Sequence, residues 1–342
     1  MNATTIGLDI AKNVFQIHGV DRHGKTVLRK QLKRAQMLAF FANLPVCRIG
    51  LEACAGAHYW ARELIKLGHD ARLISPQFVK PYVKGNKNDA NDAEAICEAV
   101  GRPNMRFVPV KSVEQQDMLM LHRIRQGLVK ERTALANRTR GLLGEYGIVI
   151  GQGLSQVRQR LPEILEDAEN QLSISARTLF AELYQRIQAL DQQVKAYEVK
   201  LQAWYRTSSV CQRLGEIPGV GPITATAMAA SLGDGKAFNS GRQVAAWLGI
   251  VPKQDSSGGK AKLLGISKRG DTYLRTLLIH GARSHVKAAA KKDDAQSRWV
   301  NELVKRRNAN IAAVAVANKN ARTIWALLTR EEAYRAPTLK AA

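Results

Sequence analysis

Short apolar runs separated by polar turns dominate the first hundred residues. The runs at 4–10, 13–21 and 26–32 surround an Asp/Gly turn, which predicts a hairpin of strands. Further along the chain, the pattern predicts a strand at 46–52, a helix at 58–67, a strand at 71–75 and a helix at 89–100. Strands that alternate with helices indicate an α/β domain with a mixed sheet, which we place at residues 1–108.

Residues 109–208 follow a helical period instead. Leucines recur every seven residues, at Leu121, Leu128, Leu135 and Leu142. A second run, from Phe180 to Trp204, alternates apolar spacings of three and four, which is typical of a coiled coil. A segment with Gly and Pro at 147–175 separates the two runs. The pattern predicts two long helices that pair either with each other, as a hairpin within one chain, or with a second protomer.

Residues 209–335 are rich in helical patterns and predict a mostly helical third domain. Two breaks interrupt it. The first is the turn IPGVGPITA at 217–225, and the second is a loop at 253–268 that is rich in Ser, Gly and Lys. We expect both breaks to be exposed, because Gly and Pro favour turns between helices.

The charge of the chain limits the classes of partner. Lys and Arg number 52 against 29 Asp and Glu, which gives a net charge of +23. Such an excess favours a polyanion, because each neutralised phosphate releases a counterion. The basic residues are spread along the whole sequence, and no apolar run approaches the roughly 20 residues needed to span a bilayer. We therefore expect a nucleic-acid partner and no membrane. Four cysteines without CxxC spacing and the lack of a signal peptide indicate a cytoplasmic protein.

Four acidic residues are candidates for metal chemistry. Asp9 lies inside an apolar strand and Glu52 ends another, while Asp89 and Asp92 share one face of a predicted helix. Each of them alone could be a helix cap or a surface ion pair. Together they form a ribonuclease H-like arrangement, and converging carboxylates are stabilised by Mg²⁺ or Mn²⁺. A site of this kind supports phosphoryl transfer.

Two further motifs indicate contact with phosphate. Gly219 and Gly221 flank a turn that resembles a helix-hairpin-helix element, although an ordinary helix–helix turn is the simpler reading. In the loop at 253–268, Ser256 and Ser257 precede two glycines. Five cations surround these serines: Lys260, Lys262, Lys268, Arg269 and Arg275. The loop is either a phosphate-gripping turn or the carrier of a serine nucleophile, which would need electrostatic activation.

These blocks, in this order, resemble a known family. The motifs are GLDIAK around Asp9, GLEAC around Glu52, KNDANDA around Asp89 and Asp92, then IPGVGPITA, AAWLGIVP, SSGGK and LGISKRGDTYLRTLLIHGA. They span nearly the whole chain and are similar to those of DEDD-type transposases of bacterial insertion sequences (the insertion sequence one-ten family), which in turn are similar to Piv-type DNA invertases.

The resemblance implies a RuvC-like catalytic domain whose tetrad is Asp9, Glu52, Asp89 and Asp92. It implies a C-terminal domain whose serine nucleophile falls at Ser257 and joins DNA covalently with metal help. It also implies a structured guide RNA, double-stranded DNA at the element ends and the target, a homo-oligomer (dimer or tetramer), and a place at the bacterial nucleoid. Two alternatives stay open: a structure-selective metal nuclease that uses water, and a non-catalytic nucleic-acid-binding protein.

Overall fold

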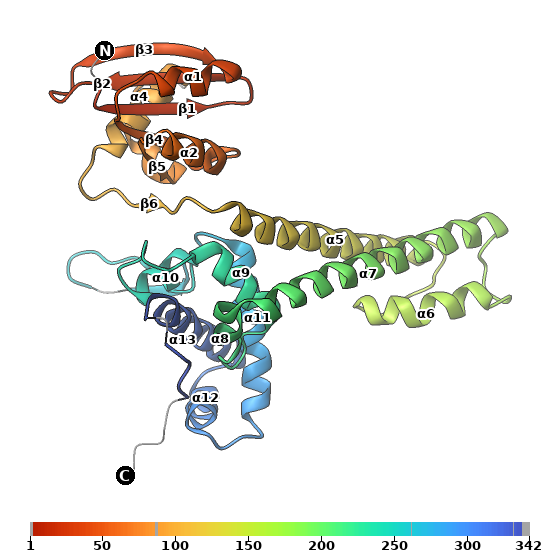
Figure 1. Cartoon of the computed structure of the whole chain (residues 1–342). Coiled ribbons are helices and arrows are strands. Elements are labelled where there is room, and N and C mark those ends of the chain that lie inside the picture. Colours follow the sequence, from red (N-terminus) through yellow and green to blue (C-terminus); the bar gives the residue numbers. More distant parts are fainter. Residues whose placement is uncertain (1–2, 86–87, 261, 331, 337–342) are drawn as a thin grey trace, which may run out of the picture. The chain divides into compact units, whose positions relative to one another are not determined.

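The computed structural model describes residues 3–85, 88–260, 262–330 and 332–336 (Figure 1). The chain divides into two compact units, Met1–Glu114 and Gln115–Ala342. The predicted parts 109–208 and 209–335 therefore fall almost entirely within the second unit. Each unit is described by itself.

A six-stranded mixed sheet forms the first unit. Its strands are β1 (Thr5–Ile10), β2 (Val14–Val20), β3 (Thr26–Lys33), β4 (Arg48–Glu52), β5 (Asp70–Ile74) and β6 (Phe107–Val108). Their order in the sheet is β3-β2-β1-β4-β5-β6. Strands β1, β4 and β5 are parallel, whereas β2, β3 and β6 run antiparallel to their neighbours. The predicted mixed sheet is thereby confirmed.

Helices cover both faces of this sheet. They are η1 (Arg34–Gln36), α1 (Met37–Ala42), α2 (Ala57–Lys66), α3 (Pro76–Val79), η2 (Lys80–Tyr82) and α4 (Asp89–Val100). Because side chains alternate along a strand, Leu8 and Leu51 point to one face, where they share a core with Trp60 of α2. The other face packs against α4, which contacts β1, β2 and β4. The helix predicted at 89–100 has the bounds that the pattern indicated.

Two glycines allow α4 to lie directly on the strands. A Cβ atom on Gly7 would overlap the carbonyl oxygen of Ala93 in α4. A Cβ atom on Gly50 would lie 2.7 Å from the Cβ of Val100. Gly7 and Gly50 thus lie where α4 comes too close to a strand for any larger residue. Close approach of another chain segment is a known reason for Gly within a strand. The first turn of α4 is held near the ends of β1 and β4 as a result.

Three helices form a long hairpin in the second unit: α5 (Val113–Gly144), α6 (Leu154–Glu166) and α7 (Ile174–Thr207). Helices α5 and α7 run side by side, with α6 against them (Figure 1). Arg132 of α5 and Arg158 of α6 both pair with Asp191 of α7. The two long helices pair with each other, as one of the two predicted arrangements requires. The heptad pattern does not hold to its end, because Leu142 is 44% exposed.

The rest of the second unit packs around one apolar core. It contains α8 (Ser209–Gly215), α9 (Pro222–Leu232), α10 (Gly241–Trp247), β7 (Pro252–Gln254), β8 (Leu263–Ile266), α11 (Thr272–Ala289), α12 (Ala295–Arg306) and α13 (Ala309–Arg330). Leu248, Leu278 and Ile324 are fully buried in this core. The C-terminal region is mostly helical, as predicted. The prediction of a plain loop at 253–268 was incomplete, because β7 and β8 form a hairpin there.

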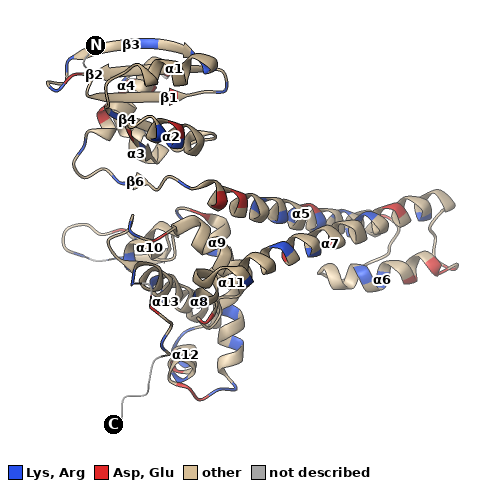
Figure 2. Cartoon of the chain, viewed as in Figure 1, with Lys and Arg blue, Asp and Glu red and all other residues tan. Residues whose placement is uncertain are grey.

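Basic residues are distributed over both units rather than collected at one end (Figure 2). Among the described residues, no helix is long and apolar enough to cross a membrane.

Candidate active site

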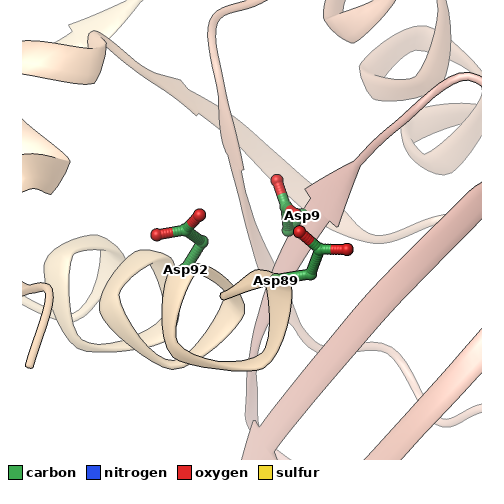
Figure 3. Close-up of side chains that lie close together, drawn as sticks. All are labelled: Asp9, Asp89 and Asp92. Carbon is green, nitrogen blue, oxygen red and sulfur yellow. The ribbon is translucent and has the colours of Figure 1, made fainter. Parts of the chain in front are cut away.

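Three of the four predicted acids come together at the end of the sheet. Asp9 lies near the end of β1, and Asp89 and Asp92 lie on the first turn of α4 (Figure 3). Each of the three offers a carboxylate oxygen, and these oxygens lie within 4.8 Å of one another. Asn88 caps the helix, because its side chain accepts a hydrogen bond of 2.7 Å from the backbone N–H of Asn91. The cap and the Gly7 contact together fix the position of the first turn of α4, which carries Asp89 and Asp92.

Glu52 lies on the strand beside Asp9. The parallel register pairs Leu8 with Leu51, so Asp9 and Glu52 each follow that pair by one residue. Both side chains therefore belong to the sheet face that carries α4. Glu52 is close enough to contribute to the charge that Asp9 experiences, although it is outside the group of three whose oxygens are closest.

The site is electrostatically strained without a cation. Burial, and then the negative charges of Asp89, Asp92 and Glu52, raise the pKa of Asp9 to about 6. Asp9 and Asp92 are half-buried, whereas Asp89 is exposed. The N-terminus of α4 offsets part of the repulsion, because its free N–H groups favour negative charge. The remaining repulsion is what a bound cation would relieve.

The donor set fits a hard divalent ion. Carboxylate oxygens are the ligands that Mg²⁺ prefers, at about 2.1 Å, so one ion joins oxygens up to about 4.2 Å apart. Oxygens within 4.8 Å of one another need only small side-chain adjustments to reach this spacing. Asp9, Asp89 and Asp92 could hold such an ion, with Glu52 at its side.

Gln16 is a neighbour of the acids that the sequence did not reveal. It lies on β2 directly opposite Asp9 in the antiparallel register. Residues opposite each other in such a pair share a face of the sheet. The run at 13–21 shows only that Gln16 alternates with buried Phe15 and Ile17. The pairing with Asp9 depends on the length of the β1–β2 turn, which the pattern does not determine.

The two candidate serines differ in their surroundings. Gly258 and Gly259, with φ of 56° and 78°, form the turn of the hairpin, and Ser257 pairs with Lys260 across it. The Oγ of Ser256 accepts hydrogen bonds from the backbone N–H of Lys262 at 3.2 Å and from the side chain of Gln254. Both serines are exposed, and Ser257 lies next to the turn. Ser256 thus helps to hold the hairpin, whereas Ser257 lies beside the two glycines of the turn.

The five predicted cations also divide into two kinds. Four of them are exposed: Lys260, Lys262, Lys268 and Arg269. Arg275 is only 8% exposed, and its guanidinium donates to the carbonyl oxygens of Leu248 at 3.0 Å and Arg269 at 2.9 Å. Its visible contacts therefore support the segment that carries Lys268 and Arg269. Lys268 has a φ of 54°, a strained value for a residue other than Gly, and its N–H donates to the carbonyl of Gly249.

The two predicted glycines of the IPGVGPITA turn play different parts. Gly219 has a φ of 86°, and a Cβ there would lie 2.8 Å from the carbonyl oxygen of Gly281 in α11. It is a close contact between two backbones. Gly221 precedes α9, and a Cβ there would meet no atom within 4 Å. Asn320 of α13 holds the turn by donating to the carbonyl of Pro218 at 2.9 Å. The turn therefore lies between α8 and α9, with Gly221 on its open side.

A carboxylate cluster at the end of a mixed sheet, in a strongly basic chain, is compatible with an enzyme that acts on DNA. Residues 211–298 match the model described as "Transposase IS116/IS110/IS902 family", and residues 6–148 match a DEDD transposase model. The chain belongs to this family of transposases, whose members cut and transfer DNA. The DEDD domain implies the use of a divalent metal.

Several curated proteins are similar to this chain over most of its length. The chain is 56% identical to a "Probable family 20 transposase" of Pseudomonas aeruginosa, over 98% of this chain and 99% of that protein. It is 49% identical to the "Transposase for insertion sequence element IS1111A" of Coxiella burnetii, over 96% and 91%. It is 25% identical to the "Pilin gene-inverting protein" of Moraxella lacunata, over 82% of each chain. The family resemblance drawn from the motifs is thereby confirmed, and the protein is an insertion-sequence transposase.

Proposed function

We propose that this transposase is a serine-dependent DNA recombinase with a metal-binding tetrad. The observation that carries the proposal is the convergence of Asp9, Asp89 and Asp92, which belong to two elements far apart in the sequence. We further propose that the first unit has a ribonuclease H-like, RuvC-related fold. The mixed sheet supports this, with Asp9 on β1, Glu52 at the end of β4 and two Asp residues on α4.

In the proposed reaction, Ser257 is the nucleophile. Its Oγ forms a bond to a DNA phosphorus while the bond from that phosphorus to a deoxyribose oxygen breaks. The hydroxyl proton is lost and the leaving oxygen gains one, so the step is reversible and the strand can be rejoined. Mg²⁺ or Mn²⁺, when bound by Asp9, Glu52, Asp89 and Asp92, would supply Lewis-acid stabilisation of the developing charge. The hydrogen bonds that engage the side chain of Ser256 within the hairpin support the choice of Ser257.

The exposed cations of the hairpin would bind DNA phosphates. Lys260, Lys262, Lys268 and Arg269 suit this role because they project into solvent. We assign Arg275 to positioning, since its guanidinium is occupied by backbone carbonyls. Gly221 would let a DNA backbone approach the start of α9, and Gly219 would hold that turn on α11.

The remaining parts of the proposal follow the family resemblance. They are a structured guide RNA, double-stranded DNA as substrate, a dimer or tetramer, and a location at the nucleoid. The division of labour would place catalysis in 1–108, assembly in 109–208 and the serine chemistry in 209–335.

The test is a plasmid recombination assay with the flanking DNA of the element, combined with trapping of a covalent protein–DNA adduct. We expect Asp9→Ala and Ser257→Ala each to lower recombination by more than about 10³-fold, because residues that act as one catalytic unit fail together. Ser257→Ala should also abolish the adduct. Ser256→Ala is the matched control and should keep both, since only a hairpin contact is lost.

Each other outcome has a definite meaning. Recombination by a folded Ser257→Ala variant would remove serine chemistry from the proposal. Loss in Ser256→Ala with activity in Ser257→Ala would move the nucleophile by one residue. Strand cleavage without an adduct, dependent on Asp9 alone, would identify a metal nuclease that uses water.

A further inference from the structure

The side chain of Gln16 lies beside Asp9 in the first unit. Gln16 is directly opposite Asp9 in the β1–β2 pair, on the sheet face that packs against α4. The Cβ atoms of such a pair lie about 4.5–5.5 Å apart. The amide is thus within side-chain reach of Asp9, which offers a carboxylate oxygen within 4.8 Å of those of Asp89 and Asp92.

Its carbonyl oxygen is an acceptor that lacks a donor. Gln16 Oε1 is buried and has no hydrogen-bond partner within the described part of the chain. A buried acceptor left unpaired costs about 1–3 kcal/mol, so native proteins rarely keep one without a reason. The neighbouring carboxylates cannot satisfy it, because ionised carboxylates only accept. The described part of the chain supplies no donor to it, and water is the donor that an acidic metal site would bring.

We propose that Gln16 is a positioning residue whose Oε1 accepts a hydrogen bond from a water molecule on the cation held by Asp9, Asp89 and Asp92. The inference rests on the metal site of the proposed function. Mg²⁺ binds few protein ligands and keeps several of its waters, so such a water needs a neutral acceptor nearby. Groups that orient the ligands of a metal change its affinity by about 10- to 100-fold when they are removed.

A purely structural glutamine would behave differently. If the amide were turned so that Nε2 donated to Asp9, its removal would destabilise the protein without metal. If Oε1 is instead unpaired without metal, an apolar side chain of similar shape should be neutral or stabilising. Under the proposal, replacing Gln16 by an apolar side chain therefore weakens metal binding without lowering the metal-free stability. A purely structural role would lower that stability.

The experiment measures Mn²⁺ binding to the full chain by isothermal titration calorimetry and thermal unfolding without metal. Gln16→Met keeps the shape of the side chain, and Gln16→Leu is a second variant in case Met packs poorly. Gln31→Met is the matched control, because Gln31 lies opposite Gln16 on β3, one strand further from Asp9. We expect Gln16→Met to bind Mn²⁺ about 10-fold more weakly with an unchanged or higher Tm. Gln31→Met should match the wild type in both.

Two results would overturn the inference while the metal site stands. One is wild-type Mn²⁺ affinity in both Gln16 variants, and the other is weaker binding accompanied by a lower metal-free Tm in both. Asp9→Ala distinguishes these from failure of the proposed function. If the wild type binds Mn²⁺ no better than Asp9→Ala, the metal site itself is absent, and the role of Gln16 falls with it.

Discussion

Asp9 and Ser257 are both proposed to act on a DNA phosphate, yet the structure holds them in opposite ways. Asp9 stands between buried Leu8 and Ile10 on an inner strand of the sheet, with α4 packed on its face. Ser257 stands near the tip of a two-stranded hairpin, and every residue of β7 is exposed. A metal site needs ligands held at fixed distances, and a packed sheet and helix provide them. An exposed hairpin can instead be ordered by the nucleic acid that it binds.

The largest expected effect concerns the packing that fixes the acids. In Gly7→Ala the added Cβ would overlap the carbonyl of Ala93, so α4 must shift from β1 or the first unit must lose stability. We expect a loss of about 3 kcal/mol in the free energy of unfolding, together with weaker Mn²⁺ binding. Chemical denaturation and calorimetry would measure the two effects.

Gly101→Ala is the control for that change, because Gly101 follows the end of the same helix with a φ of −77° and ordinary contacts. It should change stability by less than about 1 kcal/mol. Equal effects at Gly7 and Gly101 would mean that the α4 contact does not hold the site.

A smaller effect is expected at the hairpin, where substitutions of Arg275 and Lys260 should have different consequences. Arg275→Ala removes a buried guanidinium from two backbone carbonyls, which should cost about 2 kcal/mol in stability. Lys260→Ala should leave stability unchanged and weaken DNA binding, with a salt dependence lower by about one counterion. Thermal unfolding and DNA titrations at several salt concentrations measure these effects. A stable Arg275→Ala variant with a reduced salt slope would show that Arg275 contacts phosphate directly.

The smallest effect concerns the charge of Asp9 without metal. Burial and the neighbouring acids raise the pKa of Asp9 from 3.8 to about 6, so the folded state holds this proton more tightly than the unfolded chain. The ionised group therefore destabilises the fold above pH 6, and the penalty fades as the pH falls from 6 toward 3.8. Asp9→Asn should gain about 1 kcal/mol at pH 7.5, allowing for solvent screening of a half-buried group.

That gain should disappear near pH 4, and Mn²⁺ affinity of the wild type should fall below pH 6 as Asp9 takes up its proton. Denaturation curves at the two pH values test the sign. A less stable Asp9→Asn variant at pH 7.5 would show that the carboxylate is stabilised by contacts that outweigh the repulsion.

Strong local patterns predicted the first unit well. Strands β1 to β5 and helix α4 follow apolar runs with clear ends, and the Asp89/Asp92 spacing places both acids on one helix face. Strand β6 has only Phe107 and Val108, too few residues for a pattern. The register that places Gln16 beside Asp9 is set by the turn between β1 and β2, so no single segment contains that information.

In the second unit, the sequence pattern predicted three features incompletely. Gly and Pro at 147–175 correctly predicted an interruption between the two long helices. The pattern did not reveal α6 within it, where Val157, Leu161 and Ile164 form a buried stripe despite Pro162. The leucine heptad drifts by about 20° per repeat on a straight helix, so burial passes from the Leu142 position to Leu143. The Gly258–Gly259 pair is a favoured hairpin turn, a signal that the Ser/Gly/Lys composition hid.

Because α4 packs closely on the sheet, the distances between the acids depend on how the helix is placed relative to the sheet. Asp9 and Glu52 move with the sheet, and Asp89 and Asp92 move with the helix. Sliding or tilting of the helix on the sheet is then the main coordinate that can open the site. Gly50 packs against Val100, eleven residues from Asp89 along α4. An added methyl group at this contact would tilt the helix and so displace Asp89 at its other end. Natural variation at such distant contacts could tune the spacing of the acids while leaving every acid in place.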